Sequence, residues 1–234
     1  MLFAYFAFKI SSMNPMVALI IELLTPLASA QRAVQMQNYM KNQFPFLGIA
    51  ADNWRKPLRL FLKKRTAPTN EALKIITLEL LELPKREYHY CAIECFAYYK
   101  KQFEADDIII FEQLIATKSW WDSVDSISSQ LVAPFFQQFP ELIAPVTTRW
   151  MQTDMIWLQR VCLIFQLSYK SKTDTVLLSN YCLQLADSKA FFIAKAIGWA
   201  LRQYAKTDAD WVQNFMAQHS FQPLSQREAL KHLN

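Results

Sequence analysis

The sequence predicts an all-α protein, and three observations lead to this fold class. Only two glycines, Gly48 and Gly198, occur among 234 residues, whereas sheets need glycine at hairpins and bulges. Apolar residues recur at helical spacing along almost the whole chain, and no strand-like alternation of useful length is present. Helices rich in aromatic residues recur at intervals of roughly 34 residues. Together these features predict helical repeats joined by short turns.

The helices follow one another along the chain, each predicted from apolar periodicity and from the signals at its ends. Proline marks four junctions, at Pro84, Pro140, Pro145 and Pro223. N-cap residue types mark three later starts, at Thr153-Asp154, Ser188 and Thr207-Asp208. In chain order we expect helices over residues 16–28, 30–43, 52–64, 69–82, 86–103, 106–116, 119–130, 131–138, 140–150, 153–169, 173–185, 188–205, 208–218 and 224–232.

The aromatic-rich helices begin near Arg86, Ser119, Asp154 and Ser188. A pitch of this size suits a pair of helices repeated in a stacked solenoid. In such an array each repeat contacts only its neighbours, and equivalent helices line one concave wall. No linker or low-complexity tract interrupts the pattern, so we expect a single domain over residues 13–234.

The amino terminus allows a second interpretation, because Ala28–Ala30 resembles a signal-peptide cleavage site. Against it, the early positive charge of Lys9 follows an apolar run, and Glu22 interrupts the run Met16–Leu24. That run is also too short to span a bilayer. We therefore expect an amphipathic first helix, a cytoplasmic protein without a membrane partner, and a non-essential extension at residues 1–12.

The composition narrows the classes of function. The chain carries 25 Lys and Arg against 20 Asp and Glu, and this net charge of +5 favours an anionic partner such as nucleic acid. The scarcity of glycine argues against P-loop and dinucleotide-binding folds. Cys91 and Cys95 lie close to His89, as in a metal site, but no CxxC pair supports one. We expect these cysteines to be small buried hydrophobic residues, and we expect no metal.

If the aromatic-rich helices are equivalent, their charged and aromatic side chains share the concave wall. Trp121 and Asp125 are four residues apart and lie one above the other on a helix face. In the next repeat Trp157 and Arg160 are three residues apart. The last repeat adds Lys195, Trp199 and Arg202. Further basic residues flank the wall: Lys41, Arg55, Lys56, Lys63, Lys64, Arg65, Arg86, Arg149, Lys170 and Lys172.

Each of these residues also has a purely structural interpretation. Tryptophan at helical spacing most often belongs to a core, and Asp125 can form a structural ion pair with Arg160. Asp122 lies at a helix start, where a carboxylate interacts favourably with the helix dipole. Taken together, however, a cationic wall suits a phosphate backbone and aromatic faces suit sugars and bases. A carboxylate among them can stabilise developing positive charge or orient a water molecule.

Long stretches of the chain resemble the DNA alkylation repair family of HEAT-like repeat DNA glycosylases, the AlkD-like proteins. The resemblance runs from about Met16 to the end of the chain. It is carried by YMKNQFPFLGI (39–49), REYHYCAIE (86–94), TKSWWDSVD (117–125), WLQR (157–160), YKSKTD (169–174), DSKAFFIAKAIGWALRQYAKT (187–207) and PLSQREALK (223–231). It implies a curved solenoid of HEAT-like repeats with a basic concave groove.

The resemblance also implies an activity and a set of residues. The activity is excision of positively charged N3- or N7-alkylated purines, such as 3-methyladenine and 7-methylguanine, from duplex DNA. The implied enzyme is a monofunctional hydrolase that needs no cofactor or metal and leaves the damaged base largely stacked. Asp125 matches the catalytic carboxylate, and Trp121 and Trp199 match the aromatic residues that flank the damaged nucleotide. Residues implied or expected to contact DNA are Arg160, Lys195, Arg202, Tyr39, Phe191, Phe192, Trp157, Lys41 and Lys118.

The chain departs from the family pattern at two positions. Gln159 and Ala194 stand where relatives often carry a basic residue, which predicts weaker DNA affinity without a change at the carboxylate. We expect an active, monomeric enzyme on double-stranded DNA. The alternative is a non-catalytic helical-repeat module that binds DNA or a protein partner.

Overall fold

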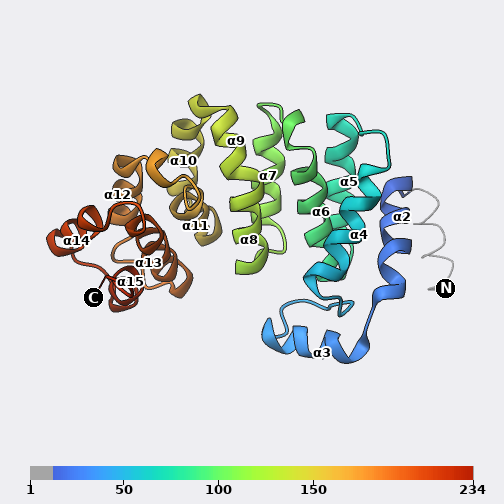
Figure 1. Ribbon diagram of the computed structural model, residues 1–234, viewed down its shortest axis with the longest axis horizontal. Coiled ribbons are helices and arrows are strands. Elements are labelled where there is room, and N and C mark those ends of the chain that lie inside the picture. Colours follow the sequence, from blue (N-terminus) through green and yellow to red (C-terminus); the bar gives the residue numbers. More distant parts are fainter. Residues whose placement is uncertain (1–12, 234) are drawn as a thin grey trace. The chain divides into compact units, whose positions relative to one another are not determined.

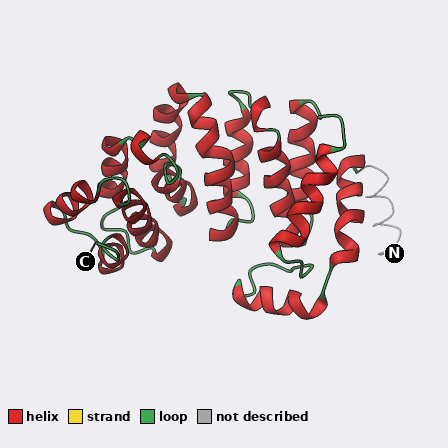
Figure 2. Ribbon diagram, viewed as in Figure 1, coloured by secondary structure: helices red, strands yellow, loops and turns green. Residues whose placement is uncertain are grey.

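The computed structural model describes residues 13–233, and the predicted extension at residues 1–12 lies outside them. Helices joined by turns and loops make up this part of the chain, and it contains no strand (Figure 2). The predicted all-α class is confirmed. The chain divides into two compact units, Met1–Glu104 and Ala105–Asn234, and each is described by itself.

The first unit contains five α-helices within its described part, labelled in Figure 1. Their cores hold apolar side chains at helical spacing, such as Trp54, Leu58 and Leu62. In chain order the elements are α2 (Pro15–Leu24), η1 (Thr25–Leu27), α3 (Ala30–Tyr39), α4 (Ala51–Lys63), α5 (Asn70–Glu82), α6 (Arg86–Tyr98) and η2 (Lys100–Gln102).

A buried carboxylate organises the loop between α3 and α4. Glu87 is fully buried on α6 and accepts hydrogen bonds from the backbone N–H groups of Leu47, Gly48 and Ile49, at 2.8, 2.8 and 3.0 Å. Gly48 adopts φ +87°, and a Cβ there would lie 2.0 Å from the carbonyl oxygen of Ser29. One of the two glycines is therefore required by a left-handed turn and by a close approach to α3.

The second unit holds the remaining helices (Figure 1). In chain order they are α7 (Asp107–Ala116), α8 (Trp121–Ile127), η3 (Ser128–Val132), α9 (Ala133–Gln138), η4 (Pro140–Leu142), α10 (Ile143–Met151), α11 (Ile156–Ile164), η5 (Lys170–Lys172), α12 (Thr175–Gln184), α13 (Phe191–Ala205), α14 (Ala209–Gln218) and α15 (Pro223–Ala229). Within this unit α11 packs against α8 and α13, and α13 packs against α15.

The second glycine allows α13 and α15 to approach closely. A Cβ on Gly198 would lie 2.4 Å from Cβ of Glu228 and 2.8 Å from the carbonyl oxygen of Ser225. Ser225 is fully buried and donates a hydrogen bond to the carbonyl oxygen of Ala194 at 2.9 Å. Gly198 is thus explained by packing, because its own backbone is ordinary helix.

Several helix boundaries differ from the expected ones. The segments expected at 119–130 and 131–138 form one continuous helical stretch through the π-helical turn η3. The helix expected at 153–169 ends at Ile164, and a separate 3₁₀ turn, η5, follows. Asp208 caps α14 as predicted, through a 2.9 Å hydrogen bond from the backbone N–H of Trp211. Ser188 does not cap α13, whose N-cap is Ala190.

No single helix between residues 13 and 233 is long and apolar enough to cross a membrane, and one pair bent by 103°, Pro15–Leu27 with Ala30–Tyr39, meets the length and composition criteria only jointly.

Candidate functional site

Asp125 and Arg160 form a two-point ion pair in the second unit. Nε and Nη2 of Arg160 donate hydrogen bonds to the two carboxylate oxygens of Asp125, at 2.7 and 2.9 Å. Asp125 lies one turn into α8 and Arg160 lies in the middle of α11, and these two helices pack against each other. The ion pair that the sequence left open as an alternative is therefore present. A paired geometry of this kind fixes the direction of the carboxylate as well as its charge.

The two partners differ in exposure. The side chain of Arg160 is 4% exposed, whereas that of Asp125 is 19% exposed. Arg160 also donates from Nη1 to the carbonyl oxygen of Phe192 at 2.6 Å, and its guanidinium lies 5.9 Å from the ring centre of Trp199. The guanidinium is thus a buried hydrogen-bond donor that orients Asp125, and the carboxylate is the group that reaches the surface.

Burial sets the protonation behaviour of Asp125. Loss of solvent around the carboxyl raises its pKa above the ordinary value of 3.8, although the hydrogen bonds and charge of Arg160 oppose this rise. The nearby Asp122 carboxylate also raises the pKa of Asp125. The ionised form is therefore less well stabilised here than in water, which makes it more responsive to a cation that arrives in the site.

Asp125 lies on the wall of an open hollow of about 570 Å³. Trp199 of α13 lines the same hollow, together with Gln203 one turn further along that helix. Ser126, Ser129 and Lys170 contribute polar groups, and Ile164 and Leu167 contribute apolar surface. A volume of this size suits a small organic ligand or part of a larger one.

Of the two tryptophans that were expected to flank Asp125, one lines the hollow and the other does not. Trp199 is half-buried and lines the hollow with Asp125. Trp121 is half-buried on α8, four residues before Asp125 and so on the same side of the helix, but it is not among the residues that line the hollow. Asp125 is therefore paired with Arg160 and shares a hollow with Trp199.

Three half-buried aromatic side chains form a cluster beside Arg160. The ring centres of Trp120 and Phe192 are 5.2 Å apart, those of Trp120 and Trp157 are 5.8 Å apart, and those of Trp157 and Phe192 are 4.9 Å apart. Such distances are typical of packed aromatic pairs. Trp157 and Phe192, expected at the DNA, thus pack on each other, while the neighbouring Phe191 is 59% exposed.

Two cations expected to contact DNA, Lys195 and Arg202, are paired with a carboxylate of α15. Nζ of Lys195 donates to Oε1 of Glu228 at 2.7 Å, and Nη1 of Arg202 donates to Oε2 of the same residue. These hydrogen bonds lower the pKa of Glu228 to about 2. The side chains of Lys195 and Arg202 are 40% and 22% exposed, so they still reach solvent.

The remaining expected contacts are spread over both units. Tyr39 ends α3 and is 71% exposed, and Lys41 follows it with a left-handed backbone at φ 53°. Both belong to the first unit. Lys118 has φ 49° in the loop before α8 and is half-buried.

Sequence reasoning missed two contributors to this region. Trp120 had no predicted role of its own, although the doubled tryptophan at a helix start was a signal for it. Lys170 was counted only among flanking bases, yet it lines the hollow of Asp125. Its position on that wall depends on the loop after α11, which no helical periodicity describes.

The cysteines pack as small hydrophobic side chains. Cys91, Cys95, Cys162 and Cys182 are all free and buried, and burial raises the pKa of each thiol. Within residues 13–233 no group of three or more His, Cys, Asp or Glu side chains is arranged to hold a metal ion.

Comparison with known proteins gives a consistent result. A family model described as DNA alkylation repair enzyme matches residues 20–233. A solved structure, the predicted DNA alkylation repair enzyme from Enterococcus faecalis, is 32% identical in sequence and superimposes with a TM-score of 0.83. That similarity covers 88% of this chain and 96% of the other. A comparison with curated proteins finds no match.

Proposed function

Because this chain belongs to the DNA alkylation repair enzyme family, we propose that it is a monofunctional DNA glycosylase acting on cationic alkylpurines. Its substrates in this proposal are 3-methyladenine, 7-methylguanine and related N3- or N7-alkylated purines in duplex DNA. The observation that carries the proposal is the carboxylate of Asp125, which accepts two hydrogen bonds from Arg160 and lines an open hollow with Trp199. The proposal includes a monomer that acts in the cytoplasm without a metal or cofactor.

The chemistry of the substrate explains why one carboxylate can suffice. Alkylation at N3 or N7 places a positive charge on the purine, so the base leaves as a neutral molecule and needs no strong acid. As the N-glycosidic bond breaks, positive charge moves to the deoxyribose, as in glycoside hydrolysis. A nearby anion stabilises this charge, and it can also hold the water that attacks the sugar carbon.

Asp125 has the features that this role requires. Arg160 fixes both carboxylate oxygens, so little reorganisation is needed when the sugar becomes positive. Burial raises the pKa of Asp125 although Arg160 opposes the rise, which supports a carboxylate whose charge is incompletely compensated. The indole of Trp199 adds attraction between its face and a cation, worth ~0.5–2 kcal/mol.

The base does not need to leave the helix fully in this mechanism. Most glycosylases rotate the damaged nucleotide into a closed pocket. The hollow beside Asp125 is open and is lined partly by polar side chains such as Ser126 and Ser129. We propose that it accepts the sugar and its adjoining backbone, with the base still stacked.

Release of 7-methylguanine from methylated duplex DNA tests the proposal. We expect the protein to release the free base and Asp125→Asn to lose about 10²–10³-fold of the rate, because the developing charge loses its anion. Binding to a duplex with a tetrahydrofuran abasic analogue should stay within about threefold, because Asp125 carries no phosphate contact in this mechanism.

Asp122→Asn is the matched control, since it removes the same charge from the first turn of the same helix. It should retain base release. Full activity in Asp125→Asn would refute the assigned role. Binding to duplex DNA without any base release by the unaltered protein would favour the alternative, a non-catalytic helical-repeat module.

A further inference from the structure

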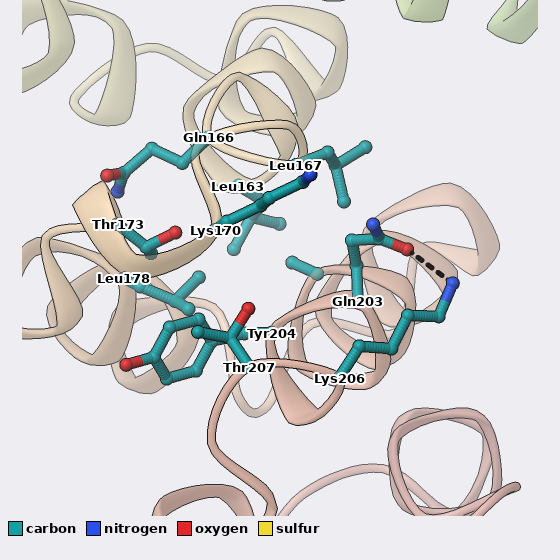
Figure 3. Close-up of a pocket in the computed structure, with 11 residues that line it drawn as sticks. Leu163, Gln166, Leu167, Lys170, Thr173, Leu178, Gln203, Tyr204, Lys206 and Thr207 are labelled. Atoms are coloured by element: carbon teal, nitrogen blue, oxygen red, sulfur yellow. Dashed lines mark hydrogen bonds between the residues drawn. The ribbon is translucent and has the colours of Figure 1, made fainter.

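A second hollow adjoins the hollow of Asp125. It has a volume of about 280 Å³ and lies between the loop after α11, the start of α12 and the end of α13 (Figure 3). The two hollows share Leu167, Lys170 and Gln203 among their lining residues. An extended ligand that enters the hollow of Asp125 can therefore continue into the second hollow.

Apolar side chains form one part of this second hollow and polar groups form the rest. Leu163, Leu178 and Ala200 contribute apolar surface. The hydroxyl groups of Thr173 and Thr207 point into the space between the helical segments in Figure 3. Hydroxyl donors above an apolar floor suit a compact anionic group attached to a carbon skeleton.

Two lysines, Lys170 and Lys206, also line the second hollow, but their ammonium groups differ in their partners. Nζ of Lys206 donates to Oε1 of Gln203 at 2.9 Å, and Figure 3 shows this ammonium group beyond Gln203, on the side away from Thr173 and Thr207. The ammonium group of Lys170 has no ion pair or hydrogen bond with any residue between 13 and 233. In contrast, Arg160, Lys195 and Arg202 each bind a carboxylate.

The backbone around Lys170 is held firmly on both sides. Lys170 itself has φ 55°, a left-handed conformation that is uncommon for a residue with a long side chain. The hydroxyl of Tyr169 donates to the carbonyl oxygen of Ala133 at 2.6 Å. Gln166 exchanges two hydrogen bonds with the backbone of Asp174, at 2.7 and 3.2 Å. Strained residues that persist in this way often mark functional positions.

We propose that this second hollow is a phosphate-binding site, in which Lys170 binds a backbone phosphate next to the damaged nucleotide. The inference rests on the proposed function, because it places the deoxyribose at Asp125 and the following phosphate beyond Lys170. Lys170 acts as a positioning residue: it holds the strand while Asp125 faces the sugar. Its ammonium group makes no contact with the reacting atoms.

The salt dependence of DNA binding tests this assignment without requiring catalysis. Lys170→Asn removes the charge and keeps a residue that tolerates the left-handed backbone. On an unmethylated duplex with a tetrahydrofuran abasic analogue, we expect the slope of log Kobs against log salt to fall by about 1. Affinity at 0.1 M salt should fall about fivefold to tenfold.

Lys172→Asn is the matched control, because Lys172 lies on the same loop, is exposed, and does not line the hollow. A series of duplexes with one neutral methylphosphonate each then identifies the phosphate. At one position beside the abasic analogue, the neutral linkage should weaken the unaltered protein and leave Lys170→Asn unaffected. The same linkage should still weaken Lys172→Asn.

Three outcomes would overturn the inference. Lys170→Asn could match Lys172→Asn in slope and affinity, or every methylphosphonate could act equally on Lys170→Asn and the unaltered protein. Inorganic phosphate alone could bind the hollow, seen by NMR shifts at Thr173 and Thr207, while the DNA effects are absent. If base release is normal and Lys170→Asn does not change DNA binding, only the phosphate site is rejected. If Lys170→Asn weakens DNA binding but the unaltered protein releases no base, only the proposed glycosylase activity is rejected.

Discussion

Two carboxylates in the second unit, Asp125 and Glu228, show opposite behaviour although both bind cations. Asp125 has one partner, Arg160, and its pKa is raised because burial outweighs that partner. Glu228 has two partners, Lys195 and Arg202, and its pKa falls to about 2. Their side chains are 19% and 11% exposed, but loss of solvent has the largest influence on the pKa of Asp125, whereas the hydrogen bonds from Lys195 and Arg202 have the largest influence on that of Glu228. The balance between loss of solvent and paired cations therefore decides the sign of each shift.

This difference separates a reactive carboxylate from a structural one. Glu228 is over-compensated and fastens α15 to α13, where Gly198 lets the two helices approach. Asp125 is under-compensated and faces a hollow, so an additional positive charge would find it poorly neutralised. A cationic deoxyribose would supply that charge in the proposed reaction.

Removing one cation from each site should produce the largest difference in stability. Arg160→Gln leaves Asp125 without a charged partner, and we expect it to lower the free energy of unfolding by about 3 kcal/mol. Arg202→Gln leaves Lys195 on Glu228, so a loss of about 1 kcal/mol is expected. Urea denaturation at pH 7 measures both. Equal losses would show that the number of partners does not matter.

Gly198→Ala should disturb the packing around Glu228 and leave the surroundings of Asp125 unchanged. Alanine normally favours a helix interior over glycine by about 1 kcal/mol. Here its Cβ would lie 2.4 Å from Cβ of Glu228, so we expect a net loss of about 2 kcal/mol from overpacking. Thermal denaturation, with base release measured below the transition, checks this. A gain in stability would contradict the close packing of α13 and α15.

The pH dependence of stability should have opposite signs at the two sites. The folded state of Glu228 has a pKa of about 2 against the ordinary 4.5, so its stabilisation is present above pH 4.5 and is lost as the pH falls towards 2. Screening by solvent reduces this effect to about 1 kcal/mol. The raised pKa of Asp125 acts in reverse, because its contribution is favourable at low pH and is lost as the pH rises past 3.8.

Differences in melting temperature between the unaltered protein and two variants measure these effects. The advantage over Glu228→Gln should shrink between pH 5 and pH 2.5, as judged from the ordinary carboxyl range. The advantage over Asp125→Asn should instead grow as the pH falls through the same range. Parallel curves for the two variants would remove the distinction between the sites.

Local sequence patterns predicted the helices better than their ends. Apolar periodicity placed a helix near each observed one, and Asp208 was identified as a cap. The end of α11 at Ile164 was missed because the following residues, which include Leu167 and Tyr169, continue the apolar pattern. Periodicity records which residues are buried, and a buried loop can carry the same apolar residues as a helix.

The sequence by itself determined the all-α class, the scarcity of turns that need glycine, and the matching stretches that single out Asp125, Arg160 and Trp199. Tertiary structure alone decided which carboxylate each cation binds. Lys195 and Arg202 share a helix with Trp199, yet they pair with Glu228, which follows them by 33 and 26 residues. Helical spacing is local and can be read along the chain, whereas an ion pair between distant residues forms only where packed helices bring the charges within reach.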